Sequence, residues 1–147
     1  MDLNEKLKLT RNTNILENNF QAFINERIKD YDLRFCEFSY LITLYENDGA
    51  SQDFIAKKKA TDKAAITRVI NSLEKKELVI REKNVEDKRI NNIFLTEKAL
   101  SYKEDLNKYL DEWFEVIKEC MSEEEYLNLA NSLEKLTNEL LSKLGKH

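Results

Sequence analysis

Basic side chains gather in one stretch of this sequence, residues 51–98. The stretch holds 12 Lys or Arg and 8 Asp or Glu, a net charge of +4, whereas the whole chain carries −4 and the remainder therefore −8. A local positive excess in an acidic protein predicts a surface for a polyanion. Within the stretch, the run Lys57–Lys59 fits either phosphate contact or an ordinary solvated group of charges.

Groups for catalysis or metal binding are sparse. Cys36 and Cys120 form no CxxC motif, and the single histidine, His147, is terminal. We find neither a His/Cys metal cluster nor a Cys–His nucleophile pair, and no phosphate-binding loop, so we expect no enzyme, metal site or cofactor. Both cysteines lie in apolar-patterned segments, which predicts buried structural thiols.

Composition indicates a mostly α-helical protein. The 147 residues are 41% hydrophobic and 35% charged, with no proline and two glycines, so few residues interrupt helices. The length fits a single domain, residues 1–147. No apolar run approaches the roughly 18 residues of a membrane span, and no signal peptide opens the chain, so we expect no membrane association and a cytoplasmic location.

Apolar periodicity predicts four helices in the first half of the chain, over residues 3–29, 35–47, 51–58 and 62–76. The polar segment Thr10–Asn14 predicts a kink or a late start in the first helix. Ser51 is the expected N-cap of the third helix, and Thr61 or Asp62 that of the fourth. Two helices separated by so few residues are typical of a helix-turn-helix.

A small β-ribbon and two long helices are expected after that motif. Apolar runs at 78–80 and 90–95 flank a polar turn and predict a wing that leans on the helices. Thr96 is the expected cap of the next helix, and Ser122 with Glu125 forms a capping box for the last one. Leucines spaced by three or four along the last helix require a helical partner.

Four short motifs together resemble the MarR family of bacterial transcriptional regulators. They are Leu73–Lys76, Leu78–Arg81, Asp87–Arg89 and Leu95–Lys98. The resemblance implies a mostly α fold with a two- or three-stranded β wing, a winged helix-turn-helix over residues 35–96 and dimerisation helices over 1–30 and 97–147. Two usual glycines are replaced by Glu77 and Ala99, which is tolerable if the backbone φ is negative there.

The resemblance also implies a homodimer that binds a pseudo-palindromic, double-stranded operator, commonly as a repressor released by a small phenolic or anionic ligand. The helix over 62–76 would read the major groove, with Arg68 best suited to guanine and Lys63 to phosphate. The alternative for Arg68 is a surface salt bridge with Glu74 or with another acidic neighbour. The helix residues that we expect at the DNA are Lys63, Ala64, Thr67, Arg68 and Asn71.

The wing would probe the minor groove with Arg89, because a narrow groove concentrates negative potential. Asp87 would orient Arg89 or a cation of the helix rather than touch DNA, as its counterpart does in the family; a plain turn residue is the alternative. Arg81, Lys83 and Lys88 are secondary candidates for phosphate contacts.

An effector pocket is expected where the winged lobe meets the dimerisation helices. The candidate lining residues are aromatic, although ordinary core packing would explain each of them: Phe20, Phe23, Tyr31, Phe38 and Tyr45. Two other function classes stay open. One is a regulator of the same fold that responds to cysteine oxidation or to a protein partner, and the other is a helical interaction protein that binds no DNA.

Overall fold

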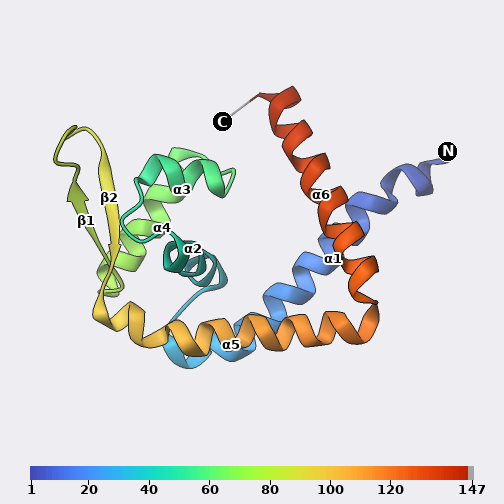
Figure 1. Ribbon diagram of the computed structural model, residues 1–147, viewed down its shortest axis with the longest axis horizontal. Helices are drawn as coiled ribbons and strands as arrows, with labels where there is room; N and C mark the ends of the chain where they lie inside the picture. The colour runs from blue at the N-terminus through green and yellow to red at the C-terminus, as the bar shows by residue number, and fades with distance from the viewer. Residues whose placement is uncertain (146–147) are drawn as a thin grey trace.

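The computed structural model describes residues 1–145, and His147 lies outside the described residues. It is mostly α with a two-stranded antiparallel wing, which confirms the predicted fold class (Figure 1). In chain order the elements are α1 (Leu3–Ile28), the 3-10 turn η1 (Lys29–Tyr31), α2 (Phe35–Glu46), α3 (Gln52–Lys58), α4 (Lys63–Lys75), β1 (Val79–Lys83), β2 (Asn91–Leu95), α5 (Glu97–Cys120) and α6 (Glu123–Leu144).

The long helix α5 joins two differently built regions (Figure 1). At one end stand α2, α3, α4 and the wing, which we call the winged lobe (residues 35–95). From the other end α6 rises on the same side of α5 as the lobe, and Leu141 near its end lines a hollow shared with α3 and the start of α4. Helix α1 runs beside α5 and α2. The lobe is thus held at one end of the molecule.

Helix starts follow the predicted caps. Asp62 accepts the N–H of Ala65 at 2.7 Å, Thr96 accepts the N–H of Ala99 at 3.2 Å, and Ser122 with Glu125 forms the predicted capping box. Each cap satisfies a backbone donor that the first helical turn leaves free. These contacts fix where α4, α5 and α6 begin.

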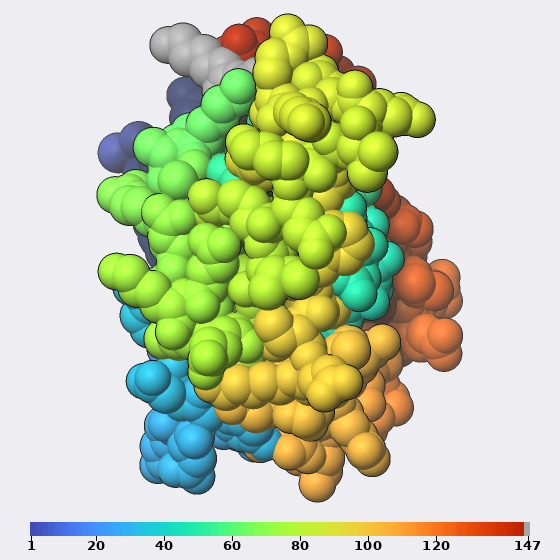
Figure 2. All heavy atoms as spheres, turned by 90° about the vertical axis from the view of Figure 1, so that its left-hand side faces the viewer, coloured from blue at the N-terminus to red at the C-terminus, as the bar shows by residue number. Residues whose placement is uncertain are grey.

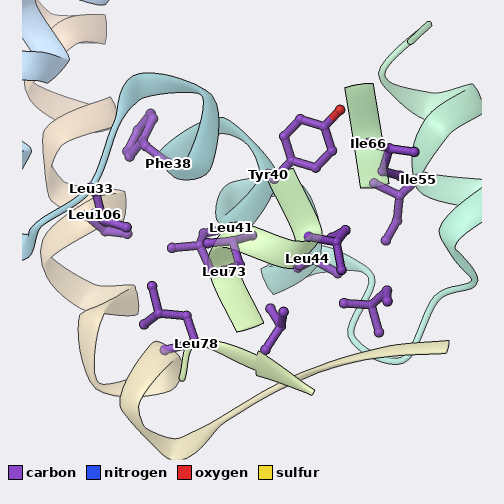
Figure 3. Packing of buried hydrophobic residues seen from close by; sticks show 14 of the residues in the cluster. Leu33, Phe38, Tyr40, Leu41, Leu44, Ile55, Ile66, Leu73, Leu78 and Leu106 are labelled. Atoms are coloured by element: carbon purple, nitrogen blue, oxygen red, sulfur yellow. The ribbon is translucent and has the colours of Figure 1, made fainter. Parts of the chain in front are cut away.

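The core of the lobe is formed by side chains from every one of its helices (Figure 3). Leu41 and Leu44 of α2, Ile55 of α3, and Ile66 and Leu73 of α4 are all essentially inaccessible to solvent. Burial of one such side chain contributes roughly 1.5–3 kcal/mol. The three helices of the winged lobe are therefore packed as one unit within a single chain.

The wing is anchored to the helices by a short third segment. The N–H of Gly49 donates to the Ile93 carbonyl at 2.8 Å, and the N–H of Ile93 donates to the Ala50 carbonyl at 2.9 Å. Gly49 has φ of +81°, and a Cβ there would lie 2.8 Å from the Phe94 ring. Glycine is thus required where this segment passes the ribbon.

One local expectation was wrong, and one condition set for the fold is not met. Helix α1 runs without a break through Thr10–Asn14, where Thr13 Oγ1 returns a hydrogen bond to the Leu9 carbonyl. The condition is the one for Glu77 in place of glycine, a negative φ; its φ is +59°. This residue sits just past the end of α4, where the N–H of Leu78 bonds the Leu73 carbonyl and the N–H of Glu77 bonds that of Glu74. This is a Schellman ending, which needs a left-handed residue whatever its type.

The expectation of buried cysteines was also wrong in this chain. Cys36 is half-buried near the start of α2, and Cys120 is exposed as the last residue of α5. An apolar periodic pattern marks the helix, but whether a given thiol is covered depends on what packs over that end.

Candidate nucleic-acid interface

Helix α4 divides into a buried face and an open face. Ile66, Ile70 and Leu73 point into the core. The predicted contact residues Lys63, Ala64, Arg68 and Asn71 are exposed on the outside of the helix. Figure 2 shows that the outer atoms of α4 and of the wing form one continuous surface. The fold therefore brings the two predicted reading elements to the same face of the molecule.

Thr67 lies on that helix but its hydroxyl is already engaged. It donates to the Lys63 carbonyl at 2.7 Å and accepts from Nε2 of Gln52 at 2.9 Å. Gln52 is the first residue of α3, so this bond ties the two helices of the helix-turn-helix together. Sequence reasoning missed Gln52.

Arg81 crosses from β1 to the recognition helix. Its Nη2 donates to Oδ1 of Asn71 at 2.8 Å and lies 3.6 Å from Oε1 of Glu74, while its Nε is buried without a partner among the described residues. Glu74 thus pairs with Arg81, and not with Arg68 as the alternative interpretation had it. The contact places Arg81 between the wing and the helix, with its side chain 25% exposed.

The wing turn presents a single arginine held by an aspartate. Asp87 accepts from Nε and Nη2 of Arg89 at 3.0 and 2.9 Å, and from the Arg89 N–H at 3.0 Å. The side chain of Arg89 is nonetheless 91% exposed. The hydrogen bond from the Arg89 side chain, and then that from its N–H, lowers the pKa of Asp87, so the pair is fully ionised near neutrality. The predicted orienting contact is present.

Asn84 shapes the same turn and was not singled out from the sequence. Its Oδ1 accepts the N–H groups of Glu86 and Asp87, an Asx turn that places Asp87 for its contact with Arg89. The remaining wing cations, Lys83 and Lys88, are exposed.

The lysine run divides into two exposed residues and one that packs against the lobe. Lys57 and Lys58 are exposed, whereas Lys59 donates to Ser39 and lies 5.1 Å from the Tyr40 ring centre. Burial lowers the pKa of Lys59. Only the first two lysines keep the character expected of a solvated or phosphate-binding cation.

A buried carboxylate fixes the far end of the recognition helix. Glu37, in the first turn of α2, is 0% exposed and accepts from the Arg34 N–H at 2.9 Å, from Lys76 Nζ at 2.8 Å and from the Ser72 hydroxyl. Burial alone would raise the pKa of Glu37, but the bonds from Arg34, Lys76 and Ser72 outweigh it, so the pKa is lowered. Sequence reasoning missed this group as well.

The junction with α5 continues that network. Lys98 Nζ donates to the Lys76 carbonyl at 2.8 Å, and the Thr96 hydroxyl donates to the Glu77 carbonyl at 2.7 Å. The end of α4 and the start of α5 are therefore bonded directly to each other.

The five aromatic candidates for an effector pocket fall into three places. Phe20 and Phe23 pack on Trp113, and Phe20 also contacts Phe35, which in turn contacts Phe38. Tyr31 packs on Tyr102, and its hydroxyl donates a hydrogen bond to Asp105. The Tyr45 hydroxyl donates to the Ala99 carbonyl at 2.6 Å. Only Phe20, Phe23 and Phe38 belong to one cluster, where α1, α2 and α5 meet.

Within residues 1–145, no helix is long and apolar enough to cross a membrane, and no group of three or more His, Cys, Asp or Glu residues is arranged to hold a metal ion.

Comparison with known proteins agrees with this geometry. Residues 36–90 match the sequence profile of the MarR family. The HTH-type transcriptional regulator BilQ of Clostridioides difficile (strain CD3) is 28% identical over 118 residues, which cover 80% of each chain.

Solved structures share the fold. A MarR transcriptional regulator from Methanosarcina mazei Go1 has a TM-score of 0.81 and 27% identity, over 91% of this chain and 96% of that one. A mutant of MarR from E. coli, crystallised in complex with operator DNA, has a TM-score of 0.82 and 22% identity, over 92% and 99% of the two chains. The profile match, the regulator relatives and the shared fold together show that the chain belongs to the MarR family of transcriptional regulators.

Proposed function

We propose that this regulator is a homodimeric repressor whose two winged lobes bind a pseudo-palindromic duplex operator. Helix α4 lies in the major groove, with Arg68 at base edges, Lys63 at phosphate and Ala64 close to the base pairs. The observation that carries the proposal is the single face formed by α4 and the wing, from which the Asp87-held Arg89 projects.

The wing supplies the minor-groove contact. Arg89 is exposed yet oriented by two bonds to Asp87, so less side-chain freedom is lost when it enters the groove. Lys83, on strand β1, and Lys88, in the turn after it, contact phosphates. The proposal places the protein in the cytoplasm, because operator DNA lies there in bacteria.

The dimer is supported by apolar side chains that a single chain leaves open to solvent. Helix α6 has no buried residue, and its Leu129, Leu140 and Leu144 are 43%, 44% and 69% exposed. Such a stripe is covered in solution by another helix, and a two-fold dimer supplies one. It also places two lobes on one duplex.

The test uses a duplex recovered from a randomised pool by binding to the protein. We expect affinity to fall steeply as salt rises, because bound phosphates release counterions. Arg89→Ala should weaken binding by about tenfold while the dimer mass stays unchanged. Arg11→Ala, an exposed arginine on α1, is the matched control and should bind as the parent does. Binding that is insensitive to salt, or to loss of Arg89, would contradict the proposal.

Release by a small phenolic or anionic ligand is the second part of the proposal. We place the ligand at the cluster of Phe20, Phe23 and Trp113, between the lobe and the dimerisation helices. Trp113 is the only tryptophan, so its fluorescence reports this place alone. Titration with a phenolic acid should quench that fluorescence and release DNA in parallel. Release without a change at Trp113 would move the ligand elsewhere.

A further inference from the structure

The wing turn, residues 84–90, has few bonds to the rest of the protein. Within it, Asp87 holds Arg89. In the part of the chain that the structure describes, one side-chain hydrogen bond leaves the turn: Nδ2 of Asn84 donates to Oδ1 of Asn92 at 3.0 Å. The position of Arg89 relative to the winged lobe therefore depends on the two strands and on this bond.

Asn92, on strand β2, continues the link into the lobe. Its Nδ2 donates to the carbonyl of Gly49 at 2.8 Å. Gly49 begins the short segment that bonds to β2 and leads into α3, where Ser51 caps the helix by accepting the N–H of Phe54. Two side-chain amides in series thus join the wing turn to the segment that enters the helix-turn-helix.

The orientation of both amides is determined by the groups at the two ends of this link. The carbonyl of Gly49 can only accept, so Asn92 presents Nδ2 to it and turns Oδ1 toward Asn84. Asn84 answers with its own Nδ2, which leaves its Oδ1 for the backbone N–H groups of Glu86 and Asp87. Each amide therefore donates toward the lobe and accepts from the side of the turn.

The two asparagines support the DNA-facing residues from behind. Asn84 and Asn92 are half-buried, whereas Val85 and Arg89 are exposed. The bonds from Arg89 to Asp87 fix the guanidinium relative to the turn, but they do not fix the turn relative to the lobe. A contact group keeps its geometry only when the residues behind it are also held, and the two amides supply that support.

We propose that Asn92 and Asn84 are positioning residues for the minor-groove contact: by joining the wing turn to the Gly49 carbonyl, they fix Arg89 relative to helix α4. The inference rests on the proposed operator binding. Loss of either amide leaves the turn free to move on its two strands. Arg89 must then be ordered at the moment of binding, and the entropy lost in that step weakens the affinity.

The experiment measures affinity for a duplex that the parent protein has selected from a randomised pool. Asn92→Ala removes both side-chain bonds of the link and should weaken binding by about threefold to tenfold. Asn91→Ala is the matched control, because it truncates the neighbouring asparagine of β2, which lies outside the link. It should bind within about twofold of the parent.

The same two variants in an Arg89→Ala background separate positioning from a general effect on the lobe. Asn92→Ala should cost less than about twofold in that background, because the residue that it positions is gone. An equal loss of affinity in both backgrounds, or no loss in the parent background, would overturn the inference while leaving operator binding intact.

Asn84→Asp is a second variant that leaves β2 unchanged, so a folding defect in Asn92→Ala does not remove the test. The carboxylate still accepts the N–H groups of Glu86 and Asp87 but can no longer donate to Asn92. We expect a loss of about threefold to tenfold that again requires Arg89. An equal loss without Arg89 would reflect only repulsion between the added charge and phosphate, and would overturn the inference. Failure of the parent to bind any duplex would instead overturn the proposed function.

Discussion

The winged lobe buries its apolar side chains far more completely than the helical arms do. The helical arms are residues 3–19 of α1 together with all of α6. Lobe residues such as Leu41, Ile55 and Ile70 are inaccessible to solvent. In the arms no residue is buried, and Leu7, Ile15, Leu129 and Leu140 all remain more than 40% exposed. One chain therefore covers the apolar side chains of the winged lobe but not those of the helical arms.

Polar contacts differ in the same way. The lobe contains long-range bonds such as Glu37–Lys76, Arg81–Asn71 and Gln52–Thr67. Contacts in the arms lie mostly within one helical turn, as in the capping boxes of α1 and α6. The lobe thus has its geometry set from within, while the geometry of the arms depends on what packs against them.

The largest effect is expected in the arms. Leu129→Glu combined with Leu140→Glu should weaken the dimer at least about a hundredfold, because each leucine covered at the interface contributes roughly 1.5–3 kcal/mol. Light scattering should then report a monomer whose lobe keeps its helical signal. Asn131→Glu with Asn138→Glu adds the same charge to the opposite side of α6 and should leave the dimer intact. A dimer that survives the leucine changes would contradict the conclusion that the arms, unlike the lobe, need a second chain to cover their apolar side chains.

The next effect concerns the lobe alone. Lys76→Met takes a charged partner from the buried Glu37 and should lower the free energy of unfolding by about 3 kcal/mol, as expected when one half of a buried pair is lost. Denaturant unfolding measures this at fixed protein concentration. Lys75→Met, at an exposed neighbouring lysine, should change stability by less than about 0.5 kcal/mol. Equal effects from the two lysines would mean that Glu37 does not hold the lobe.

A smaller effect is expected from acid. The pKa of Glu37 is lowered on folding, so its contribution is complete above the pKa of an unfolded glutamate, about 4.3, and is lost as the pH falls toward the folded value. The parent should lose stability between neutral pH and about pH 3 more steeply than Glu37→Gln does. Glu124→Gln, at the exposed start of α6, should keep the parent slope. Parallel curves for all three proteins would contradict the assignment.

The smallest effect is a gain. Glu77 adopts a left-handed backbone at the end of α4, which costs roughly 1–2 kcal/mol; glycine avoids this strain but makes the unfolded chain more flexible. Glu77→Gly should therefore raise the free energy of unfolding by about 0.5 kcal/mol. Glu82→Gly, within a strand, should lower it instead. A loss at Glu77 would show that its side chain has a stabilising contact of its own.

What the sequence could predict is mostly local. The caps at Ser51, Asp62 and Thr96 were identifiable because a cap and its backbone partner lie three residues apart. The Asp87–Arg89 contact could be predicted for the same reason, since its partners lie two positions apart in the chain. Helix periodicity likewise located the buried faces of α2 and α4.

The missed groups are joined across longer stretches of chain. Glu37 and Lys76 are 39 residues apart, and Gln52 and Thr67 are 15 apart. In sequence, Glu37 resembles any surface glutamate in the first turn of a helix. Its burial follows from the packing of α2 against α4, which a local pattern does not encode. Exposure of Cys120 is the converse case, because an apolar helical pattern does not say what covers the end of a helix.

The bonds from Thr96 and Lys98 join the start of α5 to the end of α4, so a tilt of α5 moves α4 with it. With 24 residues, α5 is about 36 Å long, so a tilt of about 5° at its far end displaces the tip by about 3 Å. That displacement is close to the rise of one base step, roughly 3.4 Å. Spin labels at Lys75→Cys, in a background with Cys36 and Cys120 changed to serine, would measure the spacing of the two tips with and without DNA or ligand. An unchanging spacing would exclude such a tilt of α5. A shift of about 3 Å would move the two α4 helices of a dimer by nearly one base pair relative to their half-sites.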